Sequence, residues 1–394
     1  MHPDLPLPAP EALEHSERLA ARLRADILAK GGAVPFSRFM ELALYAPGLG
    51  YYSAGASKFG AAGDFVTAPE MGELFAASVA NALAPVLRQT GAQSRVLELG
   101  GGSGAFAEAA LRRLQLLDAL PARYAILEPS ADLRQRQRQR LHGALEPALA
   151  ARGEWLDRPF DDEWDGALFA NEVIDALPAT RFMVNDGEVY EETVELDGQG
   201  RFMRGAQAAD WLLAAAVRHV EHYLERPFAQ GYRSEILPQL PYWAQAVVGG
   251  MRRGAMLFVD YGHGRAEFYR DDRRDGTLRA FYRHRMHEDV YRWPGLQDIT
   301  ASVDFTALAE AGVGAGFELA GYCHQAGFLL GNGIAELLET AADHANEVEQ
   351  LRLREQFKRL TLPAGMGERF QAMGFARDVD FSHAFSLGDL SWRL

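Results

Sequence analysis

The spacing of apolar residues in the N-terminal part of the chain predicts helices. Over 11–32, leucine and isoleucine recur at helical spacing until a Gly-Gly pair stops the pattern. A second, shorter helix is predicted within 35–52 and ends at a Pro-Gly pair. The glycine-rich segment 53–70 follows, and it is too long to serve only as a connection. Its last four residues, Thr-Ala-Pro-Glu, have a capping-box pattern that predicts a third helix running to Pro85 or beyond.

From Arg95 onward the pattern changes to alternating strands and helices. Short apolar runs are separated by helical stretches, and this alternation is typical of a parallel, doubly wound sheet. A hairpin is predicted over 181–196, because Asn-Asp-Gly stands between two strand-like runs. The predicted strands are 95–99, 124–130, 166–173 and 254–262, followed by a Gly-rich strand pair within 317–333 and helices from Ile334 onward.

These patterns predict four consecutive parts. Residues 1–92 form a helical region with a loop that covers the ligand, and 93–180 form the first part of an α/β core. Residues 181–250 are an insertion made of the hairpin and helices. Residues 251–394 complete the core sheet and add C-terminal helices.

Composition places the protein in a broad class. Of the 394 residues, 48% are apolar and 24% are charged, as in soluble globular proteins. No apolar run approaches the roughly 20 residues that a membrane span needs. The N-terminal sequence lacks the basic and apolar regions of a signal peptide and carries acids, which transit peptides avoid. We therefore expect a cytoplasmic protein that does not act on membranes.

Charge and side-chain chemistry exclude several partners. A net charge of -14 argues against nucleic acid, and the arginines of 134–140 lie two apart, which predicts a solvated helix instead of a basic stripe. Cys323 is the single cysteine, which excludes an intramolecular disulfide and a multi-cysteine zinc site. His284 and His287 lack a companion metal-binding motif, so we expect hydrogen-bonding roles and no metal.

The sequence RVLELGGGSGAFAEAAL joins a strand to a helix through a glycine turn, the layout of a nucleotide site. Gly100 and Gly102 match the dinucleotide fingerprint together with Ala105. With Gly104 instead, they match the turn of S-adenosylmethionine (SAM) enzymes. A nucleophile elbow around Ser103 would need glycine at position 105. A strand–helix junction without a ligand is the fourth alternative.

Polar residues at three strand ends discriminate between these alternatives. Glu98 precedes the turn, where a dinucleotide fold is normally apolar, and a carboxylate there suits the cationic sulfonium and ammonium groups of SAM. Glu128 can accept hydrogen bonds from both ribose hydroxyls, in NAD and SAM folds alike. Asn171 and Glu172 end a further strand at the crevice where such sheets bind ligands. Together these residues favour SAM.

Six ordered segments resemble the MidA family of SAM-dependent methyltransferases, which includes a mitochondrial arginine methyltransferase needed for complex I assembly. The resemblance extends from about Pro35 to the tail MGERFQAMGF, and Gly101 departs from a proline that is common in relatives. It implies a class I, Rossmann-like α/β fold with a doubly wound sheet, an N-terminal helical addition and a large insertion before the fifth strand. The segments are PFSRFMELALYAPGLGYY, GDFVTAPE, LELGGGSG, NEVIDALP, DYG and QDITASVDF.

The resemblance also implies SAM as cofactor, with S-adenosylhomocysteine as product, a glycine turn on SAM and a glutamate on its ribose. Two further strand ends and a Gly-rich loop with the character of a lid complete the expected site. The candidate cofactor-binding residues are Glu98, Gly100, Gly102, Gly104, Glu128, Asn171, Lys58, Gly63 and Asp64.

An arginine acceptor, which the resemblance implies, requires carboxylates that orient the guanidinium and stabilise its positive product. Glu172 is the first catalytic candidate, at a strand end beside the expected methyl position. Asp175 shares its face if a helix starts there, or it only caps that helix. Tyr261 and His284 are weaker candidates for lining the acceptor pocket.

Two other functions stay open at this stage. The chain could be a SAM-binding assembly factor that holds a partner with little catalysis, or a small-molecule methyltransferase. A protein substrate predicts an open, acidic groove, whereas a small molecule predicts a closed apolar pocket. The residues do not decide whether a complex I subunit is the acceptor, nor whether the chain forms a homodimer.

Overall fold

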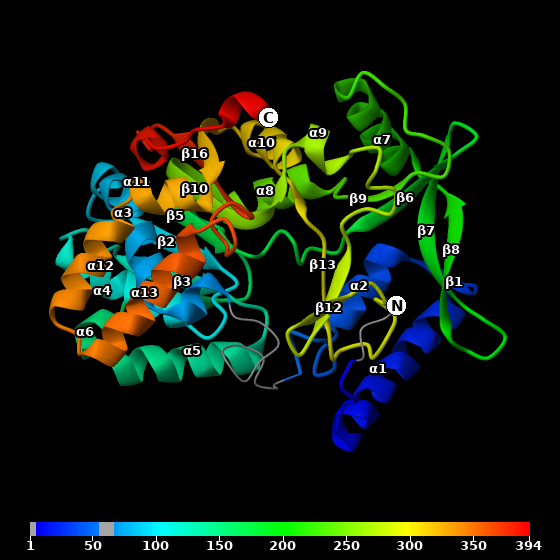
Figure 1. Ribbon diagram of the computed structural model, residues 1–394, viewed down its shortest axis with the longest axis horizontal. Coiled ribbons are helices and arrows are strands. Elements are labelled where there is room, and N and C mark those ends of the chain that lie inside the picture. Colours follow the sequence, from blue (N-terminus) through cyan, green and yellow to red (C-terminus); the bar gives the residue numbers. More distant parts are fainter. Residues whose placement is uncertain (1–4, 55–66) are drawn as a thin grey trace. The chain divides into compact units, whose positions relative to one another are not determined.

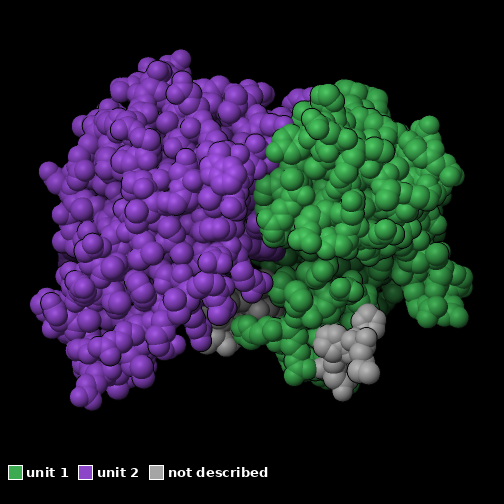
Figure 2. Space-filling view, turned by 45° about the horizontal axis from the view of Figure 1, so that its top comes forward, with its two compact units in different colours: residues 1–65, 174–239, 263–304 green, residues 66–173, 240–262, 305–394 purple. Residues whose placement is uncertain are grey.

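The structure, a computed structural model, describes residues 5–54 and 67–394 and divides into two compact units, shown in Figure 2. Helix α3 (Glu73–Thr90), which the sequence pattern grouped with the N-terminal region, belongs to the unit that holds the glycine turn. The N-terminal helices share the other unit with the insertion. The first unit comprises Met1–Phe65, Ile174–Gln239 and His263–Asp304, and the second unit comprises Val66–Val173, Leu240–Gly262 and Phe305–Leu394.

A mixed β-sheet organises the second unit (Figure 1). The strands along its main path are β2 (Arg95–Leu99), β3 (Arg123–Leu127), β4 (Gly153–Leu156), β5 (Glu163–Asn171), β10 (Gly250–His263), β15 (Glu318–His324) and β16 (Phe370–Arg377). They are ordered β15-β16-β10-β5-β2-β3-β4, and only β16 runs antiparallel to its neighbours. The connections change direction between β2 and β5, where α/β sheets bind ligands beyond the carboxyl ends of their strands. The expected doubly wound α/β fold is confirmed.

Helices cover both faces of this sheet. Besides α3 they are α4 (Ala105–Leu116), α5 (Ala131–Ala144), α6 (Pro147–Ala150), α8 (Leu240–Val248), α10 (Phe305–Gly314), α11 (Gln325–Gly331), α12 (Ile334–Asp343), α13 (Glu347–Thr361) and the 3-10 helices η1 (Ala68–Met71), η2 (Ser382–Phe385) and η3 (Ser391–Arg393). Leu257 packs in one core with α3 and α4. The next residue, Phe258, projects to the opposite face and contacts Trp243 of α8. Strands buried on both faces explain their nearly continuous apolar sequences.

The first unit combines the N-terminal helices with antiparallel sheets. Its elements are α1 (Pro10–Ala29), β1 (Ala33–Pro35), α2 (Phe36–Tyr45), β6 (Thr180–Asn185), β7 (Glu188–Leu196), β8 (Phe202–Ala208), α7 (Trp211–Tyr223), β9 (Arg233–Ile236), α9 (Arg265–Phe268), β11 (Arg279–Tyr282), β12 (Arg285–His287), β13 (Asp298–Thr300) and β14 (Val303–Asp304). The predicted hairpin is confirmed as β6 and β7. Asp186 and Gly187 at its tip have φ values of 51° and 77°, as a type I′ turn requires.

Two local predictions were wrong. The Thr-Ala-Pro-Glu segment forms only the short η1, and α3 begins after Gly72, whose φ of 143° no continuing helix can adopt. The segment 317–333 holds one strand, β15, and then α11, while the partner strand β16 lies far along the chain. Its glycines form no hairpin turn between two strands: a Cβ on Gly327 would lie 2.8 Å from the Leu387 carbonyl oxygen, and Gly333 lies in the turn between α11 and α12.

The surface features agree with the composition. In 5–54 and 67–394, every helix is too short or too polar to cross a membrane. The basic cluster lies on α5 as expected, and two of its four arginines pair with acids of the same unit. Arg136 contacts Asp132 at 2.9 Å and Arg140 contacts Glu108 at 2.8 Å, so part of the positive charge of the cluster is compensated.

Candidate functional site

The glycine turn between β2 and α4 needs glycine at three positions. Gly100, Gly102 and Gly104 have φ values of 66°, 51° and 83°, which side-chain-bearing residues rarely adopt. Gly101 has ordinary backbone angles, but a Cβ there would lie 2.6 Å from Cγ2 of Ile126. The hydroxyl of Ser103 donates to Glu70 of η1, which makes it a turn residue and not a nucleophile. The turn therefore brings bare backbone and the N-terminus of α4 to the edge of the sheet.

Glu98 lies buried at the end of β2, on the side of the sheet covered by α3 and α4. Its side chain is 3% exposed and accepts a 2.8 Å hydrogen bond from the hydroxyl of Tyr124 on β3. Burial raises the pKa of Glu98 to about 8, and the negative charge of Glu128 contributes to the rise. A cation placed beside these carboxyls would lower both pKa values and bind more tightly as they ionise.

Glu128 directly follows β3 and is held by the segment after it. The N–H of Ser130 donates to its carboxylate at 2.9 Å, and a side-chain nitrogen of Arg134 donates to its backbone carbonyl at 2.9 Å. Burial raises the pKa of Glu128 to about 7. The strand end therefore presents a carboxylate of fixed orientation near the turn, which suits recognition of a diol.

Gln137 of α5 joins these parts, and the sequence interpretation missed it. Its side-chain nitrogen donates to the carbonyl of Gly102 at 2.9 Å and to Glu128 at 3.4 Å. Its oxygen accepts from Trp155 at 3.0 Å, and the side chain is fully buried. The sequence did contain a sign that Gln137 is buried. It lies four residues after Leu133 and four before Leu141, so it shares the buried face of a helix whose other residues are mostly polar.

Asn171 and Glu172 lie at the carboxyl end of β5, one strand from β2. Glu172 has a φ of 52°, a strained conformation for glutamate, and its N–H donates to the carbonyl of Val259 at 2.9 Å. The side-chain nitrogen of Asn171 donates to the Glu172 carboxylate at 3.0 Å. The buried oxygen of Asn171 accepts no hydrogen bond within the part of the chain that the structure describes. Strain and an unsatisfied acceptor at one strand end are typical of a functional site.

The remaining candidates lie in other parts of the chain, and their roles stay predictions. Asp175 belongs to the first unit, in a turn without a helix, so neither a shared helical face nor a capping role applies. His284 is exposed in the turn between β11 and β12 of the first unit. Tyr261 follows Asp260 on β10 and packs edge-on against Phe370. Lys58, Gly63 and Asp64 lie outside the described residues.

The arrangement in the second unit fits SAM. Bare backbone at the glycine turn leaves room for a ligand, and Glu98 and Glu128 supply carboxyls for cationic groups and for ribose hydroxyls. The oxygen of Asn171 adds an acceptor that awaits a donor. In 5–54 and 67–394, no cluster of three histidine, cysteine or acidic residues is arranged to hold a metal ion.

Comparisons with known proteins agree with this geometry. The profile of a family described as "Putative S-adenosyl-L-methionine-dependent methyltransferase" matches residues 78–323. The "Protein arginine methyltransferase NDUFAF7 homolog, mitochondrial" of Drosophila melanogaster is 30% identical over 410 residues, covering 96% of this chain and 90% of the relative. The Danio rerio protein of similar name is 28% identical, covering 90% of this chain and 86% of its own.

A solved structure matches nearly the whole chain. It is described as a "likely methyl transferase" from Burkholderia thailandensis bound to S-adenosyl-homocysteine. The two chains share 41% identity with a TM-score of 0.90, over 99% of this chain and all of the other. The resemblance indicated by the six ordered segments is confirmed. This chain belongs to the family of S-adenosyl-L-methionine-dependent methyltransferases, and S-adenosyl-L-methionine is its cofactor.

Proposed function

We propose that this methyltransferase acts on the guanidinium group of an arginine side chain in a protein, with a respiratory complex I subunit as the substrate that the family resemblance suggests. The relatives from Drosophila melanogaster and Danio rerio are named protein arginine methyltransferases. The observation that carries the proposal is the carboxylate of Glu172, which Asn171 holds on a strained backbone at the end of β5, the strand next to β2. When bound, SAM supplies an electrophilic methyl group on a cationic sulfonium.

The cofactor contacts divide among three strand ends. Gly100, Gly102 and Gly104 let the main chain approach the cofactor closely, because no Cβ intervenes. Glu128 accepts hydrogen bonds from the ribose hydroxyls. Glu98 and Asn171 face the cationic and donor groups of the methionine part, since both present buried acceptor oxygens on the same side of the sheet.

Glu172 serves the acceptor. The bond from its N–H to Val259 and the bond from Asn171 to its carboxylate help to fix it. A carboxylate so held can accept paired N–H bonds from a guanidinium and stabilise the positive charge of the methylated product. Asp175 was predicted as a second carboxylate for this role. That role stays a prediction, to be tested by the same assay with Asp175→Asn.

The test is methylation of two peptides that differ only in arginine or lysine at the acceptor position. The arginine peptide should be methylated well and the lysine peptide poorly. A site that accepts paired hydrogen bonds from a planar guanidinium cannot hold the compact ammonium group of lysine equally well. Glu172→Gln should keep SAM affinity nearly unchanged and lower turnover by about 10²–10³, the size expected for a lost transition-state contact. The matched control is Glu318→Gln, an exposed position on β15.

Four outcomes would overturn the proposal. Equal methylation of both peptides, or full turnover by Glu172→Gln, would rule out arginine recognition by Glu172. Transfer of labelled methyl to a small molecule in a cell lysate would indicate a small-molecule methyltransferase. Tight SAM binding with no labelled product at all would indicate an assembly factor that binds SAM without turnover.

A further inference from the structure

Polar side chains continue from Glu172 along the carboxyl edge of the sheet, onto β10, β16 and β15. The N–H of Glu172 reaches the carbonyl of Val259, and the next residue, Asp260, is paired directly with Gln371 of β16. Gln371 in turn is paired directly with His324 of β15. Residues paired across antiparallel strands project to the same face with Cβ atoms about 5 Å apart. We call Asp260, Gln371 and His324 the edge row.

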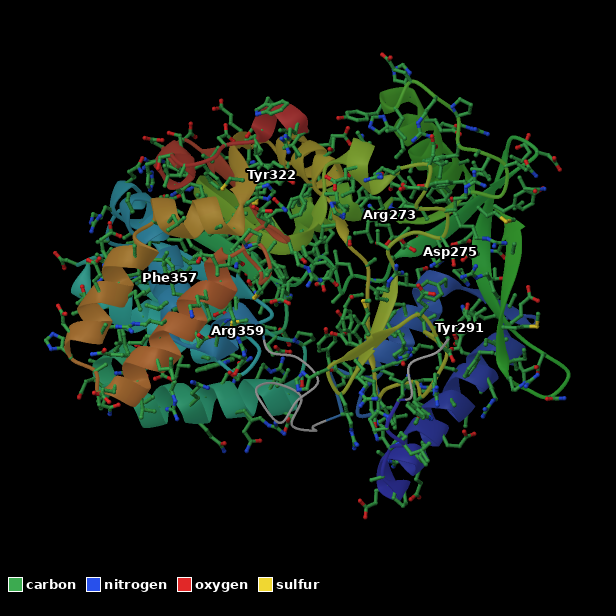
Figure 3. The ribbon with its side chains drawn as sticks, in the orientation of Figure 1. Arg273, Asp275, Tyr291, Tyr322, Phe357 and Arg359 are labelled. Atoms are coloured by element: carbon green, nitrogen blue, oxygen red, sulfur yellow. The ribbon has the colours of Figure 1, made fainter. Side chains whose placement is uncertain are left out.

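Figure 3 labels Tyr322, which lies two residues before His324 on β15 and locates this end of the sheet. Tyr322 packs against Phe305 of α10, with ring centroids 5.2 Å apart. Side chains two positions apart on a strand share a face, so His324 lies on the face covered by α10. Asn171 projects to the opposite face, because its register partner Val259 belongs to the core with α3 and α4. The edge row is thus distinct from the candidate cofactor contacts.

Two members of the edge row carry buried polar atoms without partners. The side-chain nitrogen of Gln371 donates to the Glu368 carbonyl at 3.0 Å. This bond fixes which atom of the side-chain amide is the nitrogen, and the other atom is therefore the oxygen. Gln371 is 4% exposed, and this oxygen accepts no hydrogen bond from 5–54 or 67–394. Nδ1 of His324 is likewise buried with no partner among the described residues. Burying a polar atom without a hydrogen bond is costly, so proteins rarely retain such atoms without a function.

We propose that the edge row binds the methyl acceptor beside the atom that is methylated, with Gln371 and His324 accepting hydrogen bonds from its N–H groups. This inference rests on the proposed function and names the chemistry that its substrate must have. An amide oxygen can only accept, and Nδ1 accepts in one neutral tautomer. Asp260 adds a carboxyl to the same row. The row therefore selects N–H donors, such as a guanidinium or peptide groups, over carboxylates and phosphates.

The length of the edge row indicates an extended acceptor. Neighbouring strands lie about 4.8 Å apart, so Gln371 is about 10 Å and His324 about 14 Å from β5. An arginine side chain alone does not span this row together with Glu172. A polypeptide does, if its flanking N–H groups reach Gln371 and His324 while its guanidinium reaches Glu172.

The first test measures binding of the arginine peptide to the full chain saturated with S-adenosylhomocysteine. Gln371→Leu should weaken peptide binding at least tenfold and leave the affinity for S-adenosylhomocysteine within twofold. His324→Phe removes the second acceptor and should act in the same direction. The control is Gln115→Leu, an exposed glutamine on α4. Unchanged peptide affinity in both variants would overturn the edge row, and so would loss of S-adenosylhomocysteine binding by either folded variant.

A second measurement separates this inference from the proposed function. The side-chain amide signal of Gln371, assigned by its disappearance in Gln371→Leu, is followed by NMR during titration with the arginine peptide and separately with acetate. A saturable shift with the peptide alone supports the edge row even if that peptide is not methylated. A shift with acetate, or with neither compound, would overturn it.

Discussion

The hydroxyl of Tyr124 donates a 2.8 Å hydrogen bond to the carboxylate of Glu98 from the neighbouring strand, and both side chains are buried. Burial raises the pKa of Glu98 to about 8, whereas the tyrosine hydrogen bond lowers it. Burial also raises the pKa of Glu128 to about 7. These two carboxyls are therefore partly protonated near neutral pH in the protein without cofactor, and a bound cation would compete with their protons.

We predict that SAM binding strengthens as the pH rises from about 6.5 to about 8.5, because the ionised carboxyls attract its cationic groups. Binding should release protons, which calorimetry detects by comparing buffers of different ionisation enthalpy. Tyr124→Phe removes the hydrogen bond that lowers the pKa of Glu98, so the rise should move to higher pH. Tyr242→Phe, which alters a 63% exposed tyrosine, is the control. A pH-independent affinity would contradict this role for Glu98 and Glu128.

The same raised pKa values make a prediction for the stability of the protein without cofactor. A carboxyl whose folded pKa exceeds its unfolded value binds more protons when folded, so its contribution to stability falls as the pH rises. For Glu98 and Glu128 this loss spans the interval from about 4.5 to about 8. Glu98→Gln should therefore reduce the decline of the melting temperature over that pH interval. If the melting temperature of the variant declined with pH as steeply as that of the wild type, a raised pKa of Glu98 would be contradicted.

Gly102→Val should abolish SAM binding. The φ of 51° at Gly102 is strained for a branched residue, and the side chain would occupy space beside the turn. Gly143→Val is the matched control, because a Cβ at Gly143 meets nothing within 4 Å and its backbone is helical. Calorimetric titration with SAM gives the comparison, and wild-type affinity in Gly102→Val would mean that the cofactor binds elsewhere.

Glu128→Ala should weaken SAM binding without unfolding the protein, because it removes only the hydrogen bonds that the carboxylate accepts from Ser130 and Gln137. Gln137→Leu should weaken SAM binding and also destabilise the protein. It leaves the Gly102 carbonyl and the Trp155 N–H without this partner, which we expect to cost about 1–3 kcal/mol of stability and to loosen the turn. Gln139→Leu changes an exposed glutamine of the same helix and should alter neither property. Thermal melts and SAM titrations of the three variants check this, and equal behaviour of the two glutamine variants would refute it.

The protein should not bind DNA or RNA in a salt-sensitive manner. Its net charge is -14, and Arg136 and Arg140 of α5 are paired with Asp132 and Glu108. A fluorescence-anisotropy titration with labelled DNA and RNA at low salt is sufficient. A micromolar affinity that falls steeply with added salt would contradict the prediction and count against a protein substrate.

The sequence by itself determined the main elements of the core and the position of the turn. The strand 95–99, the glycines at 100, 102 and 104, and the hairpin at 181–196 were all predicted within a few residues. Such features depend on residues close together in the chain, through side-chain period, proline and glycine stereochemistry, and turn preference. Glu98 and Glu128 could be singled out for the same reason, since each stands at the end of a readable strand.

Only the tertiary structure decided which side chains meet. Gln137 reads as one polar residue of a solvated helix, and it becomes a link between Gly102 and Glu128 because α5 packs against α4 and β4. The pairing of Gln371 with His324 depends on β16 lying between β10 and β15, and their distance in the chain hid it from local patterns. Strand order is set by how apolar faces bury one another across the whole unit. That long-range packing, and no short-range preference, determines the environment of each buried polar group.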